Sequence, residues 1–324
     1  AAGSSVAMVD YAGTWDTNAV TVSPNGSEKI GGTAADANLS TEGQSVTFVY
    51  IDGTQGWVNV LDSTSNVVGA SFLTATVSGG CNTLATCGDY KIATFKGPGT
   101  FCVSAVGNPS GSDSVEVLAV AAGGGGGGCN AGGGAAGAVA TNPSNSVTVQ
   151  GYPIVIGGGG TAGSGGPGGG GDGGTGNAVT FFGHTVRAGS GGKGSTSPGS
   201  MAGTYSNGGG GAGVADGVPY AQASTKVCGV SHPAITGYTI GAGFNGGAAR
   251  NPSNPPNPGP GNLAGGGAGA GAVGTSPCSP SVAGAGGVGI SNSINGTPYF
   301  WGGGGGGGTN NGTAGAGGNG GGGG

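Results

Sequence analysis

Hydrophobic and polar positions are arranged differently in the two parts of the chain. The front of the sequence contains short runs of Val, Thr and aromatic residues that roughly alternate with polar ones, a pattern typical of β-strands. Such runs are Ala19–Val22, Ser45–Ile51 and Gly56–Val60, and Asn-Gly and Asp-Gly turn signals separate them. We therefore predict a small β module over residues 1–75, with Trp57 in its core.

A second group of β-strands is expected over residues 76–122. Tyr90–Phe95 and Thr100–Ala105 flank a Lys-Gly-Pro-Gly sequence, which predicts a hairpin. Ser114–Ala121 predicts a third strand, and it runs almost directly into the six glycines Gly123–Gly128. A strand that enters a glycine run without a linker indicates that the two pack together.

The pattern changes after residue 122, because glycine replaces the alternating side chains. Of the 89 glycines, 16 lie in residues 1–122 and 73 in residues 123–324. No amphipathic 3.6-residue period occurs, and glycine costs roughly 1 kcal/mol per residue relative to alanine inside a helix. We therefore expect no α-helix anywhere in the chain.

Ordering this much glycine requires an unusual arrangement, since fixing each glycine is costly and no side chain can be buried in return. Polyproline-II helices of nearly pure glycine can pack side by side, because the main-chain groups point outward and no Cβ atom keeps neighbours apart. Each N–H then bonds to a neighbouring helix for about 1 kcal/mol net. We predict such a polyglycine-II sandwich over residues 123–324, with nearly pure glycine inside. Alanine-bearing segments such as Ala264–Gly274 are expected at the surface.

Charge and composition exclude several functional classes. Only 6% of the residues are charged and the net charge is −5, so nucleic acid is not an expected partner. No run of 18 apolar residues occurs, so no membrane insertion is expected. The chain has two histidines and the glycine-rich region has only two acids, so we predict no catalytic residues, no metal site and no cofactor.

Six cysteines are present, and an even count permits 15 pairings between which spacing cannot choose. We expect buried thiols or structural disulfides. Cys228 and Cys278 both lie in loops flanked by proline, and we select them as the candidate disulfide.

Several segments resemble a known group of proteins. GDYKIATFKGPGTFCV at Gly88–Val103, followed by SVEVLAVAAGGGGGG at Ser114–Gly128, resembles the entry to a glycine-rich domain of tail-fibre and other virion structural proteins of marine, notably cyanobacterial, bacteriophages. VTVQGYPIVIGGGG resembles the next element of that domain, and NAVTFFGHTVRAGSGG resembles the short strand pair that follows it. VTFVYIDGTQGWVNV resembles a small β module of the same proteins. More distantly, the glycine layout resembles the polyglycine sandwich of phage tail-tip adhesins.

The resemblance implies a non-enzymatic structural or adhesive component of a virion, either a tail fibre or a receptor-binding protein. It also implies a homotrimer that contacts other tail proteins, and a glycan or outer-membrane protein of the host as receptor. Loops at the margin of the glycine scaffold would bind that receptor, and aromatic side chains suit such contacts. The candidate receptor-binding residues are Tyr205, Tyr220, Tyr238, Tyr299, Phe300 and Trp301.

Two alternatives stay open. The chain is a purely structural virion part, such as a collar fibre, a tail-surface protein or a capsid decoration protein. In that case the aromatic residues seal the scaffold against neighbouring proteins. Otherwise it is an extracellular glycine-rich filament or matrix protein.

Overall fold

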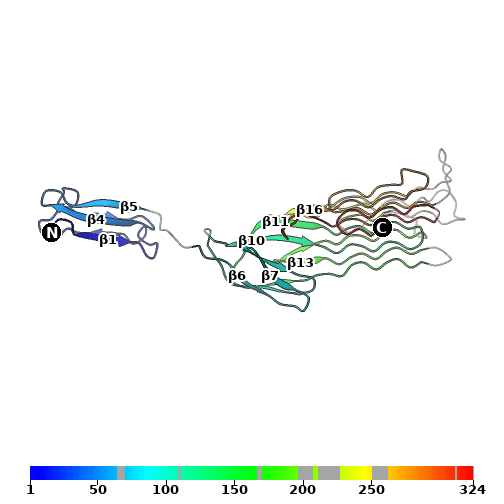
Figure 1. Ribbon diagram of the computed structural model, residues 1–324, viewed down its shortest axis with the longest axis horizontal. Coiled ribbons are helices and arrows are strands. Elements are labelled where there is room, and N and C mark those ends of the chain that lie inside the picture. Colours follow the sequence, from blue (N-terminus) through cyan, green and yellow to red (C-terminus); the bar gives the residue numbers. More distant parts are fainter. Residues whose placement is uncertain are drawn as a thin grey trace. The chain divides into compact units, whose positions relative to one another are not determined.

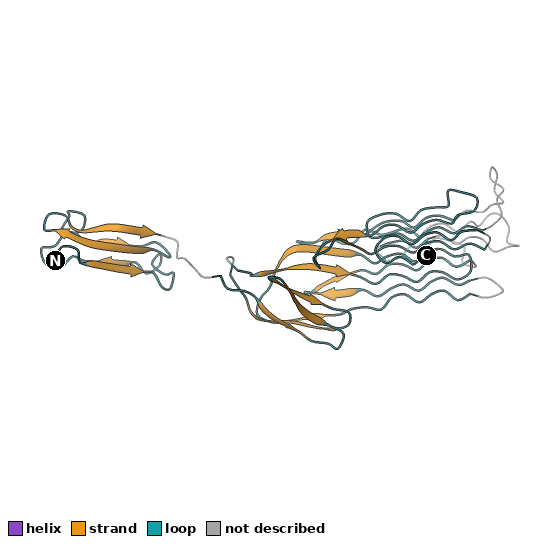
Figure 2. Cartoon of the chain, viewed as in Figure 1, coloured by secondary structure: helices purple, strands orange, loops and turns teal. Residues whose placement is uncertain are grey.

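The computed structural model describes residues 1–63, 70–108, 111–165, 170–195, 207–210, 227–249, 262–310 and 312–323. Within these ranges the protein is all-β and contains no helix, as predicted (Figure 2). The chain forms two compact units, Ala1–Ala70 and Ser71–Gly324.

The first unit is built on a three-stranded antiparallel sheet in the order β1-β4-β5, accompanied by the antiparallel pair β2-β3. Its core consists of Leu39, Val46 and Phe48, and Trp57 packs against them as predicted. All three strands expected here are present: two lie within one residue of the predicted bounds, and the third, β5, extends three residues beyond its predicted end. The strands are β1 (Ser5–Val9), β2 (Val20–Val22), β3 (Ala37–Leu39), β4 (Ser45–Asp52) and β5 (Gly56–Ser63).

The second unit begins with two three-stranded antiparallel sheets, β12-β9-β6 and β10-β11-β15. Its core includes Phe101, Val103, Val179, Phe181 and Val186. The pairs β7-β8, β13-β14 and β16-β17 complete the β structure. The strands are β6 (Thr74–Val77), β7 (Thr83–Cys87), β8 (Tyr90–Thr94), β9 (Gly99–Ala105), β10 (Ser114–Val120), β11 (Val139–Ser146), β12 (Gly151–Ile154), β13 (Val179–Phe181), β14 (His184–Val186), β15 (Thr239–Gly241), β16 (Ile290–Asn292) and β17 (Tyr299–Trp301).

The prediction of a hairpin across Lys96–Gly99 is wrong. Both strands exist, but β8 pairs with β7 and β9 lies between β6 and β12. The side chain of Asn82 holds the connection open: its Oδ1 accepts the N–H groups of Lys96 and Gly97 at 3.0 and 3.2 Å. These two amides are therefore used in a loop rather than in a tight turn between β8 and β9.

The division of the chain lies between Ala70 and Ser71, a few residues before the expected end of the first module. The strands of residues 76–122 belong to the same compact unit as the glycine-rich region, and β10 leads into that region in both chain order and space (Figure 1). The β structure is therefore the base of the glycine-rich part.

Beyond the strands, the glycine-rich region forms an array of extended segments that run alongside one another (Figure 1). Main-chain hydrogen bonds join the segments at every third residue. In segment 121–128, for example, Gly124 and Gly127 donate to segment 131–138 at 2.8 and 3.0 Å. A three-residue period is compatible with polyproline-II packing, which has three residues per turn.

Segment 131–138 shows how many neighbours one segment can have. It exchanges main-chain hydrogen bonds with five others, and a Cβ atom on its residue Gly132 would overlap the carbonyl oxygen of Gly210. Only glycine permits this approach. Its bonded neighbours are segments 121–128, 187–194, 207–210, 263–271 and 302–308.

The expectation that alanine lies only at the surface of the array is wrong. Ala264, Ala268 and Ala270 are completely buried, although the sequence predicts their segment at the surface. Ala135 and Ala138 are likewise buried in segment 131–138. Their methyl groups occupy gaps between segments, so the array has some apolar burial in addition to its hydrogen bonds.

Candidate binding site

In the described part of the glycine-rich region, the exposed aromatic side chains belong to the β16-β17 hairpin. Its register pairs Ile290 with Trp301 and Asn292 with Tyr299. The turn is held by Asn292, whose Oδ1 accepts the N–H of Ile294 at 2.8 Å, and by Gly296, whose φ of 90° suits glycine. The hairpin is therefore a regular element and not an irregular loop.

Tyr299, Phe300 and Trp301 share strand β17 but not one environment. Alternation places Tyr299 and Trp301 on one face, with ring centroids 5.9 Å apart, and Phe300 on the other. Tyr299 is 62% exposed and Phe300 is 42% exposed. Trp301 is half-buried, and its Nε1 is buried with no hydrogen-bond partner in the part of the chain that the structure describes.

Strand β17 continues directly into the glycine array. The carbonyl oxygen of Gly302 accepts the N–H of Ala270 at 2.8 Å, and Gly303 donates to Gly320 at 3.0 Å. A Cβ atom on Gly302 would lie 3.0 Å from the side chains of Ala270 and Val139. Two bulky, partly exposed rings are thus fixed to a scaffold of main chain, which reduces the entropy lost on binding.

The hairpin lies at the end of the array that joins the strands. Figure 1 shows β16 where the strands meet the glycine segments, and a Cβ atom on Gly241 of β15 would overlap Cδ1 of Ile290 in β16. The predicted residues Tyr205 and Tyr220 lie outside the described residues.

Tyr238 is partly buried and packs against the core of the second unit. Its ring lies 5.5 Å from that of Phe181 and 5.3 Å from that of His184. The hydroxyl donates to Oδ1 of Asn145 at 2.8 Å, and burial raises the pKa of this phenol above its ordinary value. For Tyr238 the structure therefore shows packing against the core of its own unit.

The predicted Cys228–Cys278 disulfide is not formed, and both residues are exposed free thiols. Neighbouring main chain holds each segment in place without a cross-link: Val227 donates to Gly209, and Thr275 donates to Ala285. The expectation of buried thiols is also wrong, because all six cysteines are exposed.

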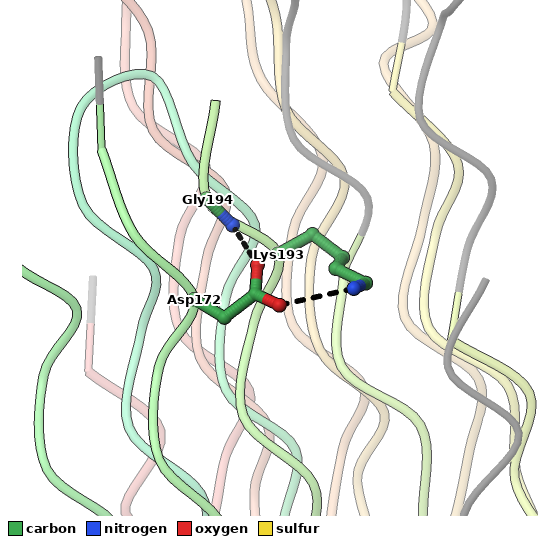
Figure 3. A network of polar contacts seen from close by, with 3 residues as sticks. All are labelled: Asp172, Lys193 and Gly194. Carbon is green, nitrogen blue, oxygen red and sulfur yellow. Dashed lines mark hydrogen bonds and ion pairs between the residues drawn. The ribbon is translucent and has the colours of Figure 1, made fainter. Parts of the chain in front are cut away.

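Asp172 and Lys193 form an ion pair between two segments of the array (Figure 3). Nζ of Lys193 donates to Oδ2 of Asp172 at 3.0 Å, and the N–H of Gly194 donates to Oδ1 at 2.7 Å. The Lys193 side chain is 6% exposed and that of Asp172 is 27% exposed. In the described residues no group of three or more His, Cys, Asp or Glu side chains could hold a metal ion.

Three exposed aromatic side chains of the described residues were not among the candidates predicted from the sequence: Tyr11, Phe72 and Tyr90. Tyr90 begins β8 at the tip of the β7-β8 hairpin and is 77% exposed. The Cys87-Gly88-Asp89-Tyr90 sequence, with Gly88 at a φ of 59°, is the turn signal that could have indicated it.

A family model described as a glycine-rich domain matches residues 94–324, well over half of the chain. The chain belongs to this glycine-rich domain family. No curated protein matches the sequence significantly. In the described residues no helix is long and apolar enough to cross a membrane.

Proposed function

We propose that this member of the glycine-rich domain family is a structural and adhesive component of a bacteriophage virion. It would act in a tail fibre or as a receptor-binding protein, without enzymatic activity. The observation that carries the proposal is the β16-β17 hairpin, where Tyr299 and Phe300 project from a scaffold of interlocked main chain. The resemblance to glycine-rich tail-fibre proteins of marine phages supports the virion context.

The chemistry of the hairpin favours a host-surface ligand with both apolar and polar faces. Aromatic rings stack on the apolar faces of sugars and also contact protein surfaces, while the Tyr299 hydroxyl can hydrogen-bond. A surface glycan or an outer-membrane protein fits this description. In the particle the chain would act as a homotrimer attached to other tail proteins.

Binding to host cells tests the adhesive role. Purified protein is expected to compete with phage adsorption on bacteria that the phage infects. The Tyr299→Ala/Phe300→Ala double variant should lose most of this competition. The control is Tyr90→Ala, which removes a more exposed ring elsewhere and should compete like the unchanged protein.

Two outcomes would contradict receptor binding. One is an absence of competition at saturating protein, and the other is equal competition by the double variant. If, in addition, a map of the particle shows the β16-β17 hairpin covered by other virion proteins, a purely structural virion part is favoured.

A further inference from the structure

Segment 131–138 has one side without a hydrogen-bonded neighbour. Its main-chain donors follow a three-residue period, as they do elsewhere in the array. Two of the three rows of N–H groups are used, since Ala135 donates to segment 187–194 and Ala136 donates to segment 263–271, each at 2.9 Å. The third row consists of Ala131, Gly134 and Gly137, and in the described part of the chain their N–H groups have no acceptor.

These three residues are all buried. Buried main-chain N–H groups are almost always paired, with protein or with water, because an unpaired one costs roughly 1–3 kcal/mol. The three unpaired N–H groups are spaced three residues apart, like the bonded N–H groups of the array. This spacing indicates a missing partner whose acceptors have the same three-residue period.

The hydrogen-bond network shows what borders the open side. The five bonded neighbours of segment 131–138 form a series in which each segment bonds to the next: 121–128, 187–194, 207–210, 263–271 and 302–308. In the described residues no main-chain hydrogen bond joins the first segment of this series to the last. The open side therefore lies between these two segments.

Both bordering segments have carbonyl rows that the array does not use. In segment 121–128 the carbonyl oxygens of Gly124 and Gly127 accept no main-chain hydrogen bond from the described residues. The same holds in segment 302–308 for Gly303 and Gly306. One row of N–H groups and two rows of carbonyl oxygens are thus unpaired around the same side. One additional segment of the array could accept hydrogen bonds from the N–H row and donate to both carbonyl rows.

We propose that this side of segment 131–138 binds a glycine-rich segment of another polypeptide in an extended, three-residue-per-turn conformation. We expect the occupant to be free of side chains, because segments of the array approach one another too closely for a Cβ atom: one on Gly134 would overlap the carbonyl oxygen of Gly124 in the neighbouring segment 121–128. The occupant comes from a different protein rather than a second copy. Every glycine run that the structure describes is bonded within its own array, and a second copy would have to break those bonds to supply one. This inference concerns a different surface from the β16-β17 hairpin and does not depend on receptor binding.

Two glycines allow the side to be blocked. A Cβ atom on Gly305 would lie 3.3 Å from the N–H nitrogen of Gly134, and one on Gly308 would lie 3.4 Å from that of Ala131. Gly305→Ala and Gly308→Ala therefore place a methyl group over the unpaired amides with only a small adjustment of their neighbours. Gly158→Ala is the matched control, because its Cβ atom would meet only Nδ2 of Asn177 at 4.0 Å.

The probe is a soluble peptide of six glycines with a lysine at each end, and the control peptide has alanine in place of glycine. Calorimetric titration of the whole chain should show binding of the glycine peptide and none of the alanine peptide. Gly158→Ala should bind as the unchanged protein does. Gly305→Ala and Gly308→Ala should each weaken binding by about tenfold or more, as expected for the loss of one or two hydrogen bonds.

Hydrogen exchange gives an independent readout. The amides of Ala131, Gly134 and Gly137 should exchange more slowly in the presence of the glycine peptide, and the change should be absent in Gly305→Ala. The proposal is overturned if the glycine peptide does not bind, or if it binds equally to both blocked variants. Concentration-dependent dimerisation that Gly305→Ala abolishes would show instead that the partner is a second copy.

Discussion

At the scale of single residues, neighbouring glycines in one run have different requirements. A Cβ atom on Gly125 would overlap the carbonyl oxygen of Thr161. The nearest atom of another segment to a Cβ atom on Gly126 would be the carbonyl oxygen of Gly132, at 4.0 Å. Gly125 is closed in by another segment and Gly126 is exposed. The sequence GGGGGG contains no sign of this difference, because the three-dimensional neighbours alone create it.

The substitution Gly125→Ala should therefore destabilise the second unit by about 1–3 kcal/mol or more, since the methyl group meets main chain that cannot easily move. Gly126→Ala should change stability by less than about 1 kcal/mol, in the stabilising direction, because alanine restricts the unfolded chain. Denaturant unfolding of both variants measures the difference. Equal effects of the two substitutions would contradict the packing of segment 121–128.

Asp10 is a second residue whose role depends on its surroundings. The carboxylate is buried, which by itself would raise its pKa, but it accepts the N–H groups of Trp15, Thr14 and Gly43 at 3.0–3.1 Å. The hydrogen bonds prevail and lower the pKa. The ionised carboxylate thus stabilises the first unit above the ordinary Asp pKa of about 4, and this contribution is lost as the pH falls through the lowered value.

We expect Asp10→Asn to lower the melting temperature of the first unit at pH 7, and the difference from the unchanged protein to shrink as the pH falls below about 4. Calorimetry between pH 7 and pH 2.5 measures this. Asp16→Asn, at an exposed aspartate, is the control and should have little effect at any pH. A difference for Asp10→Asn that stays constant with pH would exclude the ionised form as its cause.

At the scale of elements, strands and glycine segments are held by different means. The strands pack side chains, as Phe101 and Phe181 do in the core of the second unit. The segments of the array mainly share main-chain hydrogen bonds, and polar side chains join them at a few places. Asn207, for example, is fully buried, and its side chain donates to the carbonyl oxygen of Ala136 and accepts the N–H of Phe244.

The Asp172–Lys193 ion pair also joins two segments of the array through side chains. Its removal should show how much one such link contributes to the free energy of unfolding. Asp172→Ala leaves the Lys193 ammonium buried without its partner, so we expect a loss of about 1–3 kcal/mol. The double variant Asp172→Ala/Lys193→Met should recover much of this, because no buried charge remains. Urea unfolding of the single and double variants checks both values. A double variant as unstable as Asp172→Ala would indicate that the carboxylate acts through Gly194 instead.

At the scale of the whole molecule, the chain consists of two units with different kinds of interior. The first unit is a small β module around Leu39, Val46 and Phe48. The second joins a β base to an array whose interior is largely main chain. Apolar burial raises the heat capacity of unfolding and polar burial lowers it, so the two units should unfold with different signatures.

Calorimetry of the intact chain should show two transitions. Asp10→Asn should shift only one of them and Gly125→Ala only the other. The transition that Gly125→Ala shifts should have a heat-capacity change per residue below the usual value of about 12–15 cal/mol/K. A single transition, or a normal heat-capacity change for the second unit, would contradict this description of its interior.

Much of this architecture follows from the sequence. Alternating side chains in Ser45–Ile51 and Ser114–Ala121 indicate strands β4 and β10, because burying one face of a strand requires that pattern. The all-β class and the lack of helices in the described residues follow from the glycine content. The sequence also predicts Tyr299, Phe300 and Trp301 as receptor-binding residues, and this stays a prediction; the structure places all three in strand β17.

Only the tertiary structure decided which groups meet. Asn82 accepts the amide of Lys96 between β8 and β9, Tyr238 packs against the core, and Ala264 and Ala268 lie inside the array. The local pattern of apolar and polar residues determines which element a segment can form, because it reflects which face of that element must be buried. The choice among chemically identical glycines, and among strands of similar pattern, depends on contacts between residues far apart in the chain, and these exist only once it has folded.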